Sequence, residues 1–453
     1  MNTRRTVSRA LRTPAALLMM NLVLAACGGG GGGGGGFPGF AVAPAPAPAP
    51  ASQGTPAPAP APEDTTPSIT TQPSDTTIGQ GMAATLKVQA ARAKTYQWQR
   101  SVDGGANWTD VSGATGDSFT TGASQLADSG QQLRVRVTGS DSGVTSRAAT
   151  LTVKPWVANV LATTGVTYGS PYQLVLDASG ANLYVAMGGN GSVYRIDTAS
   201  GSGVEVTPGT TMNTPYGLAL AADGTLYVSD QHRINKIAAN ATTYSTWVGG
   251  GTSGYADSPA VPMFSNPASI ALDGAGNLFV ADLGNKRVRK VAADGTTSTL
   301  AGDGTQANLD GVGTAAQFAR PQGLAISRDG RTLYDTDTDS LCLRKIDVAS
   351  ATVSTLLGDC ANGGVIDGTA ATPAKLGYSY GVTVDAHDNV FLTHAWDGVA
   401  RVVTPAGEIN TLRDSTGAAL TFNFPIGVAV AGDGTVYVGA SNGNKIFKLT
   451  LAP

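Results

Sequence analysis

The sequence has few charged side chains and lacks the short motifs of several enzyme classes. Only 13% of its 453 residues are charged, and no lysine- or arginine-rich run follows the N-terminal leader. Nucleic acid and anionic membrane surfaces are therefore poor electrostatic partners. The part expected to fold contains no HExxH, GxSxG, P-loop or dinucleotide-binding pattern, so no catalytic motif points to an enzyme.

Small and β-branched residues dominate in place of charged ones. The chain contains 60 glycines and 24 prolines, whereas aromatic residues make up 6%. Valine, threonine, glycine and alanine prevail in the second half, which favours many short strands over helices. The length is sufficient for two or three domains with a sizeable core. We therefore predict an all-β fold.

The first 26 residues read as an export signal. Four arginines precede an apolar run at residues 15–26, which is too short to span a bilayer. The run ends in Leu24-Ala25-Ala26-Cys27, which resembles the lipobox of bacterial lipoproteins. This resemblance implies cleavage before Cys27 and a lipid on its sulfur. An ordinary secretory signal that happens to contain a cysteine is the alternative.

The expected location follows from the same segment. Loss of the four leader arginines changes the formal charge from −3 to −7. Gly28 follows Cys27, and resemblance to the usual lipoprotein sorting rule favours the outer membrane of the cell envelope. The membrane is then a partner through the lipid anchor only. The sequence does not distinguish a periplasmic from a surface orientation, or the Sec from the twin-arginine export route.

Residues 27–65 are expected to be a disordered N-terminal tether. Residues 28–36 are an unbroken glycine run, and residues 43–62 are mostly alternating alanine and proline. Neither composition can bury a core. The glycine run predicts a flexible coil, and the Ala-Pro run predicts an extended spacer of about 3.1 Å per residue.

Residues 66–155 are predicted to form a small β-sandwich. Short alternating strands are separated by Gly, Asp and Ser turns. The segment resembles bacterial immunoglobulin-like domains, with Tyr96-Gln97-Trp98 matching the central strand and Asp128-Ser129-Gly130 matching a corner. It departs from antibody-type domains in having no cysteine. The resemblance implies that Trp98 packs in the core.

Residues 156–453 contain an internal repeat. Each unit has an apolar strand, a tight turn, an aromatic-valine strand, a third strand ending in a basic-aliphatic pair and, in most units, a fourth strand. The units begin at Pro171, Pro215, Pro267, Pro321, Ser379 and Pro425. A repeat of about four strands in six units predicts the blades of a β-propeller.

The unit resembles the NHL repeat, as in Pro267 to Val291, which reads PASIALDGAGNLFVADLGNKRVRKV. The connectors containing Asp310-Gly311 and Asp367-Gly368 resemble those of bacterial NHL proteins. The predicted fold is therefore a six-bladed NHL-type β-propeller behind the immunoglobulin-like domain. The last unit lacks a fourth strand. Residues 157–162, which precede the first unit, have the pattern of a fourth strand but belong to no unit. We expect these two ends to pair and remove an exposed edge.

The residue after each unit's first position starts an innermost strand near the channel mouth. Aromatic and amide side chains at these positions could stack on a ligand and hydrogen-bond to it. The alternative is that they fill a tapered channel. The long connectors and the turns between second and third strands are expected at this same end, which we call the long-loop end. The candidate ligand-binding residues here are Tyr172, Tyr216, Gln322, Tyr380, His232 and His394.

A metal site has weaker support. His387 falls at the opposite end of its unit from His232 and His394, so the three histidines cannot share one metal. Three carboxylates recur at the end of the second strand, and a divalent cation such as Ca²⁺ at the channel mouth is one explanation. Hydrogen bonds to backbone N–H groups in each carboxylate's own turn are the other. These carboxylates are Asp230, Asp282 and Asp337.

Cys342 and Cys360 flank the hairpin of the third and fourth strands in the fourth unit. An exported compartment permits disulfides, and folding the hairpin near Ala349-Ser350 brings the two cysteines close to register. We predict a disulfide, with two buried thiols as the alternative.

These features favour a non-enzymatic binding or scaffolding protein of the cell envelope. We expect a protein, peptide or glycan ligand at the long-loop end, no nucleic acid and no required cofactor. The rival is a metal-dependent enzyme similar to lactonase or lyase propellers, and a purely structural spacer is a third possibility. The fold alone does not name the ligand or the oligomeric state.

Overall fold

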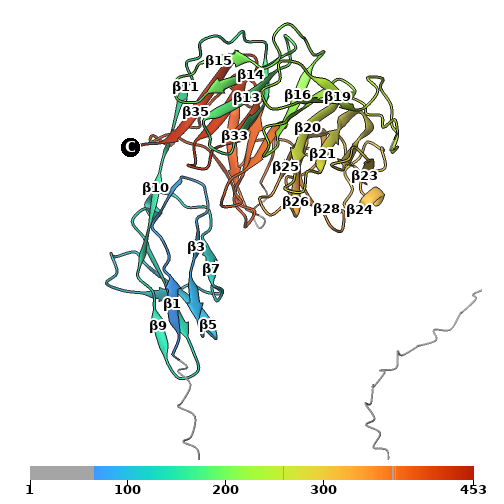
Figure 1. Cartoon of the computed structure of the whole chain (residues 1–453). Coiled ribbons are helices and arrows are strands. Elements are labelled where there is room, and N and C mark those ends of the chain that lie inside the picture. The colour runs from blue at the N-terminus through green and yellow to red at the C-terminus, as the bar shows by residue number, and fades with distance from the viewer. Residues whose placement is uncertain (1–65, 259, 370–371, 373) are drawn as a thin grey trace, which may run out of the picture. The chain divides into compact units, whose positions relative to one another are not determined.

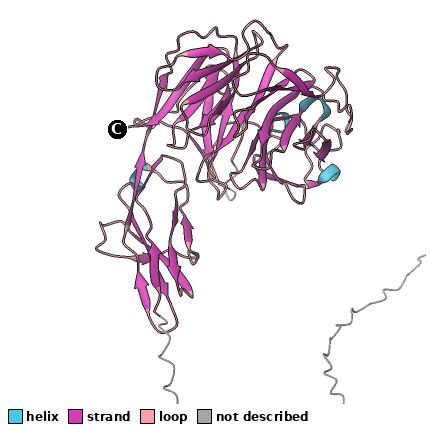
Figure 2. Ribbon diagram, in the orientation of Figure 1, coloured by secondary structure: helices cyan, strands magenta, loops and turns pink. Residues whose placement is uncertain are grey.

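The computed structural model describes residues 66–258, 260–369, 372 and 374–453. Strands dominate these residues, and the helical elements among them are single 3-10 turns (Figure 2). The signal sequence, Cys27 and the tether lie outside the described residues. In the described part, no helix is both long enough and apolar enough to span a membrane.

Residues 68–154 form a group of short strands around an apolar centre. One sheet has the order β2-β10-β8-β5-β6, with β9 beside β8, and two further pairs are β1-β4 and β3-β7. Trp98 is fully buried, and its indole N–H donates to the Gly116 carbonyl at 3.1 Å. The elements are β1 (Ser68–Thr71), β2 (Thr76–Gly79), β3 (Thr85–Lys87), β4 (Gln89–Ala91), β5 (Thr95–Ser101), β6 (Thr109–Asp110), β7 (Ser118–Thr120), η1 (Leu126–Asp128), β8 (Gln132–Thr138), β9 (Gly143–Thr145) and β10 (Ala149–Lys154).

Residues 156–451 form six antiparallel sheets, numbered here one to six in chain order of their first strands (Figure 1). Sheet one has β12 (Pro171–Leu176), β13 (Asn182–Met187), β14 (Ser192–Asp197) and β15 (Gly203–Glu205). Sheet two has β16 (Pro215–Leu220), β17 (Leu226–Asp230), β18 (Arg233–Ile237) and β19 (Ser245–Val248). Sheet three has β20 (Pro267–Leu272), β21 (Leu278–Asp282), β22 (Arg287–Val291) and β23 (Thr297–Ala301), with η2 (Leu283–Asn285) before β22.

The remaining three sheets follow the same plan. Sheet four has β25 (Pro321–Ile326), β26 (Thr332–Asp337), β27 (Cys342–Asp347) and β28 (Thr352–Leu357), extended by β24 (Gly311–Val312), with η3 (Gly313–Ala315) and η4 (Thr338–Ser340). Sheet five has β29 (Ser379–Val384), β30 (Val390–His394), β31 (Val399–Val403) and β32 (Ile409–Thr411). Sheet six has β33 (Pro425–Val430), β34 (Val436–Ala440), β35 (Lys445–Leu451) and, from before the first sheet, β11 (Trp156–Val160).

The first strand of each sheet lies innermost. Each contacts the first strand of the next sheet, and β33 of sheet six contacts β12 of sheet one. The two ends of the region meet in sheet six, where β11 pairs antiparallel with β35, with Val157 opposite Thr450. The pairing expected between residues 157–162 and the last unit is therefore present, and it supplies that sheet's fourth strand.

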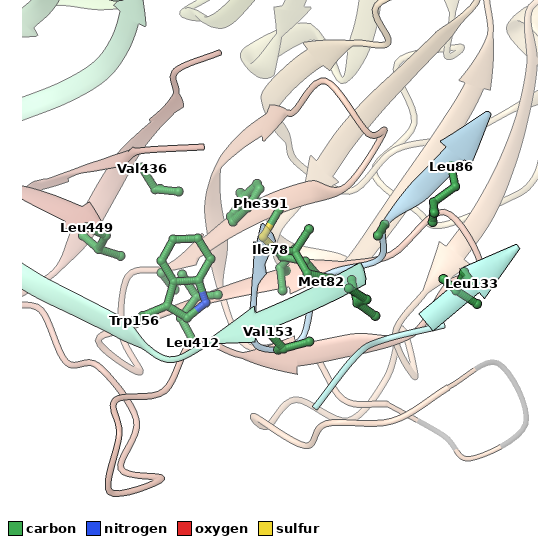
Figure 3. Close-up of a cluster of buried hydrophobic side chains, with 14 of the residues drawn as sticks. Ile78, Met82, Leu86, Leu133, Val153, Trp156, Phe391, Leu412, Val436 and Leu449 are labelled. Atoms are coloured by element: carbon green, nitrogen blue, oxygen red, sulfur yellow. The ribbon is translucent and has the colours of Figure 1, made fainter. Parts of the chain in front are cut away.

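An apolar cluster joins residues 68–154 to sheets five and six (Figure 3). Trp156 lies between them, 1% exposed, with its indole N–H donating to the Gln80 carbonyl at 3.1 Å. Its ring meets Phe391 edge-on, with centroids 6.2 Å apart. Gly79 permits this approach, because a Cβ there would lie 2.2 Å from the indole. Tight packing of this kind fixes the two regions against each other.

Candidate binding site at the long-loop end

A β-bulge lies at the start of the first strand in each sheet, where the candidate side chains are placed. In all six sheets, the register between first and second strands shifts directly after the opening residue. In sheet two, for example, Pro215 pairs with Asp230 and the regular ladder resumes at Leu218 opposite Val228. Such bulges redirect a side chain at the end of a strand. The residues after the opening positions are Tyr172, Tyr216, Ala268, Gln322, Tyr380 and Ile426.

Four of the predicted ligand residues converge on the channel. The Tyr172 and Tyr216 rings lie 5.0 Å apart, and Gln322 Nε2 donates to the Tyr216 hydroxyl at 2.7 Å. Tyr216 and Tyr380 both line a remaining cavity of about 10 Å³, which is the size of about one water molecule. Burial raises the pKa of Tyr216 above its usual value of 10.0. At this level the tyrosines fill most of the space between the first strands.

Aromatic rings continue outward from this filled level. Tyr380 lies 5.8 Å from Phe424, Phe424 lies 5.3 Å from Trp396, and Trp396 lies 6.4 Å from Tyr378, measured between ring centroids. Trp396 is 69% exposed and Tyr378 is 44% exposed. We call Tyr378, Trp396 and Phe424 the aromatic strip. It places large apolar surface in water at the long-loop end, which is typical of binding surfaces.

Three loop segments form the strip. Trp396 lies in the turn between β30 and β31, whereas Tyr378 and Phe424 end the connectors before β29 and β33. One feature of the sequence could have indicated the strip, because Tyr378 and Phe424 both directly precede the opening residue of a unit. The position of Trp396 in the third segment carried no comparable pattern, and the proximity of the three rings depends on the folded structure.

The recurring carboxylates hold the connectors. Asp230, Asp282 and Asp337 are fully buried. Each accepts a backbone N–H from the connector into its own sheet, from Thr214 at 2.9 Å, Ser265 at 2.8 Å and Ala319 at 3.0 Å, respectively. The expectation that these N–H groups belong to the carboxylate's own turn is wrong, because the second strand ends beside the incoming connector. Burial raises the pKa of Asp282 and of Asp337, although these hydrogen bonds oppose the rise.

Buried arginines form a second set of connector contacts that the sequence reading missed. Arg289, Arg344 and Arg401 are fully buried in the third strands of sheets three, four and five. Each pairs with a connector carboxylate, namely Asp257, Asp310 and Asp367, respectively. From the sequence, Asp310 and Asp367 were recognised only as part of connectors that resemble those of bacterial NHL proteins, and no ion pair was predicted for them. In strand register Arg401 lies opposite Leu392, as Arg289 lies opposite Val280, so Arg401 is the counterpart of Arg289 in sheet five.

The three histidines lie in different environments in the structure. His394 is buried in the position that Asp230 occupies in sheet two, and its Nδ1 lies 3.2 Å from the Ser379 hydroxyl. Burial lowers its pKa to about 3. His232 Nδ1 accepts the Asn266 N–H at 3.1 Å. His387 lies in the turn between β29 and β30, at the opposite end. Among the described residues, no three His, Cys, Asp or Glu side chains are grouped as metal ligands.

A disulfide joins Cys342 and Cys360, whose Cα atoms lie 5.2 Å apart. Cys342 opens β27, and Cys360 follows β28 in the connector to sheet five. The bond therefore ties the start of this connector to sheet four.

A cleft lies away from the aromatic strip. It has a volume of about 450 Å³ and opens between sheets one and two, where Tyr184, Arg195, Glu205 and Asn240 line it. Turns between first and second strands and between third and fourth strands contribute to it, so it belongs to the end with short turns. The sequence carried no signal for this cleft.

Comparisons with known proteins bear on parts of the chain. A family model described as a domain of unknown function (DUF8696) matches residues 68–155. Over 149 residues the chain is 30% identical to Protein SUPPRESSOR OF QUENCHING 1, chloroplastic, of Arabidopsis thaliana. That match covers 30% of this chain and 14% of the plant protein.

Solved structures resemble more of the chain. A Bacteroides thetaiotaomicron protein of unknown function has a TM-score of 0.54 and 15% identity, covering 86% of this chain and 99% of that one. An auxiliary nutrient binding protein from Bacteroides ovatus has a TM-score of 0.51 and 13% identity, covering 85% of this chain and 98% of that one. At these identities the likeness shows the fold alone, which is all-β and propeller-like.

Proposed function

We propose that the chain is a non-enzymatic binding module of the cell envelope that offers its long-loop end to a protein, peptide or glycan. The observation that carries the proposal is the aromatic strip, in which Trp396 is 69% exposed and is supported by two neighbouring rings. Exposed aromatic side chains dominate many recognition surfaces because they bury a large area at small entropic cost. A binding protein among the fold neighbours is consistent with this role.

The architecture that we infer would hold the long-loop end away from the membrane, where a ligand can reach it. The six sheets would be the blades of a closed NHL-type propeller, residues 66–155 an immunoglobulin-like spacer, and Cys27 a lipid anchor in the outer membrane. The contacts between successive first strands and the pairing of β11 with β35 support ring closure. The leader sequence supports the anchor. A cell-surface or periplasmic ligand would then meet the long-loop end.

The enzyme alternative depends on Asp230, Asp282 and Asp337, whose recurrence has a bound cation as one explanation. Their oxygens already accept connector N–H groups, and Asp282 also pairs with Arg289 Nη1 at 2.9 Å. A cation would have to displace these buried contacts. The geometry therefore favours a structural role for the three carboxylates.

The proposal can be tested with the purified full chain on arrays of glycans, peptides and envelope proteins, followed by crosslinking to any ligand found. We expect crosslinks at the connectors before β29 and β33. Crosslinks confined to residues 66–155, or no ligand in any class, would overturn it. Tyr216→Ala is a poor probe because Tyr216 also fills the channel, whereas Trp396→Ala removes an exposed ring.

A further inference from the structure

The aromatic strip is built to hold its rings in place. The Ala395 N–H donates to the Tyr378 carbonyl at 3.0 Å, which joins the Trp396 turn to the preceding connector. The Phe422 N–H donates to the Gly398 carbonyl at 2.7 Å, which joins the same turn to the following connector. Three chain segments are thus linked through backbone hydrogen bonds, so a ligand meets rings that are already positioned.

Phe424 adds evidence of a constrained conformation. Its φ is +57°, in the left-handed region that bulky side chains seldom adopt. Ser170 and Asn266, which also directly precede an opening residue, have φ values of +60° and +48°, so this conformation belongs to the repeat. Here the conformation places the Phe424 ring between Tyr380 and Trp396.

Polar groups beside the strip define the chemistry of its ligand. Asp397 follows Trp396 and is exposed, and Asn423 precedes Phe424 and is also exposed. The Asp397 carboxylate lies against Gly377, where a Cβ would come within 1.8 Å of its Oδ2, so only glycine leaves room for it. The nearby cation Arg401 is buried and pairs with Asp367 at 3.0 Å. The strip therefore combines apolar ring surface with a carboxylate and an amide.

We propose that the aromatic strip binds an uncharged glycan, with a pyranose ring stacked on Trp396 and its hydroxyls hydrogen-bonded by Asp397 and Asn423. A pyranose has an apolar C–H face, which complements an exposed indole, and vicinal hydroxyls, which complement a carboxylate and an amide. The exposed carboxylate disfavours anionic polysaccharides. This inference rests on the proposed binding function and names the ligand class for the same site.

Affinity electrophoresis and calorimetry of the full chain test the inference. The ligands are soluble neutral polysaccharides (a β-glucan, a xylan and a glucomannan), the anionic polygalacturonate, and proline-rich peptides. We expect a neutral glycan to bind more tightly than polygalacturonate. Trp396→Ala should weaken the binding of the neutral glycan at least tenfold. Trp396→Phe should lose less affinity, and Asp397→Asn should weaken binding severalfold.

The control is Tyr255→Ala, which removes an aromatic ring that is 45% exposed in the connector before β20, outside the strip. It should leave glycan affinity unchanged, and thermal melting should show that every variant is folded. Neutral glycan binding that survives Trp396→Ala overturns the site but leaves the binding function standing. Trp396-dependent binding of the peptides instead of glycans overturns the ligand class. Absence of binding to every array member overturns the proposed function as well.

Discussion

Asn389 binds both backbone polar groups of Ala83. Its Oδ1 accepts the Ala83 N–H at 3.0 Å, and its Nδ2 donates to the Ala83 carbonyl at 3.2 Å. Asn389 follows the turn between β29 and β30, whereas Ala83 lies between β2 and β3, so the contact joins regions 306 residues apart in sequence. Both residues are buried. The backbone of one region is thus satisfied by a side chain of the other.

Asn389→Ala should destabilise the protein by about 1–3 kcal/mol, because it leaves the buried Ala83 N–H and carbonyl without these partners. Urea denaturation monitored by Trp fluorescence measures the change. Asn277→Ala is the matched control, since Asn277 makes the same turn contact with Asp273 at 2.8 Å that Asn389 makes with Asp385 at 2.9 Å. Equal losses in the two variants would show that the Ala83 contact contributes nothing.

Asp335 should make stability depend on pH. It replaces the valine found at this position in sheets two and three, Val228 and Val280, and neither of its oxygens has a hydrogen-bond donor among the described residues. Burial, and then the charge of Asp337, raise its pKa well above 3.8. Because the unfolded chain releases this proton at lower pH, its ionisation lowers stability as pH rises from about 3.8 towards the raised pKa.

Asp335→Asn removes this titration and Asp335→Val also removes the buried polar group. The stability gain of either variant over the native chain should grow with pH above about 4. The valine variant should gain about 1–3 kcal/mol near neutral pH. Denaturation midpoints between pH values of about 4 and 8 provide the comparison. A constant difference across that range would contradict the assignment.

Reduction of the Cys342–Cys360 disulfide should lower stability by about 3 kcal/mol, because the bond closes a loop with a sequence separation of 18 residues. Non-reducing peptide mapping by mass spectrometry should recover the linked pair from exported protein. The double variant Cys342→Ala/Cys360→Ala should melt at the temperature of the reduced chain. Two thiols that react freely with iodoacetamide in the oxidised native protein would refute the bond.

Cys27→Ser should release the protein from membranes, since the lipid predicted on Cys27 is its expected membrane attachment. Cell fractionation and incorporation of labelled palmitate report the outcome. Cys360→Ala serves as the control, because it removes a cysteine without touching the lipobox. Membrane association that persists in Cys27→Ser would point to a different anchor.

The sequence was most informative where the repeat imposes a pattern. The opening residues such as Pro215 start the first strands as predicted, and Tyr216 and Tyr380, which follow two of them, line the small cavity between these strands. The aromatic strip was not predictable in this way, because Tyr378, Trp396 and Phe424 belong to segments that only the fold brings together. The buried position of Arg401 was also not predictable, because successive residues of a strand face opposite sides and the exact strand register was not known from the sequence.

The ion pairs between connectors and sheets affect how much the connectors at the long-loop end can change in sequence. Arg289 and Arg344 each anchor a connector through Asp257 and Asp310, close to where the loop begins its return to the next innermost strand. Such an anchor lets the exposed portion beyond it change in length and composition while the strand ladder keeps its register. Conformational entropy lost on ligand capture is reduced as well, because each loop is already held at a fixed point. The long-loop end therefore combines sequence tolerance with a rigid frame.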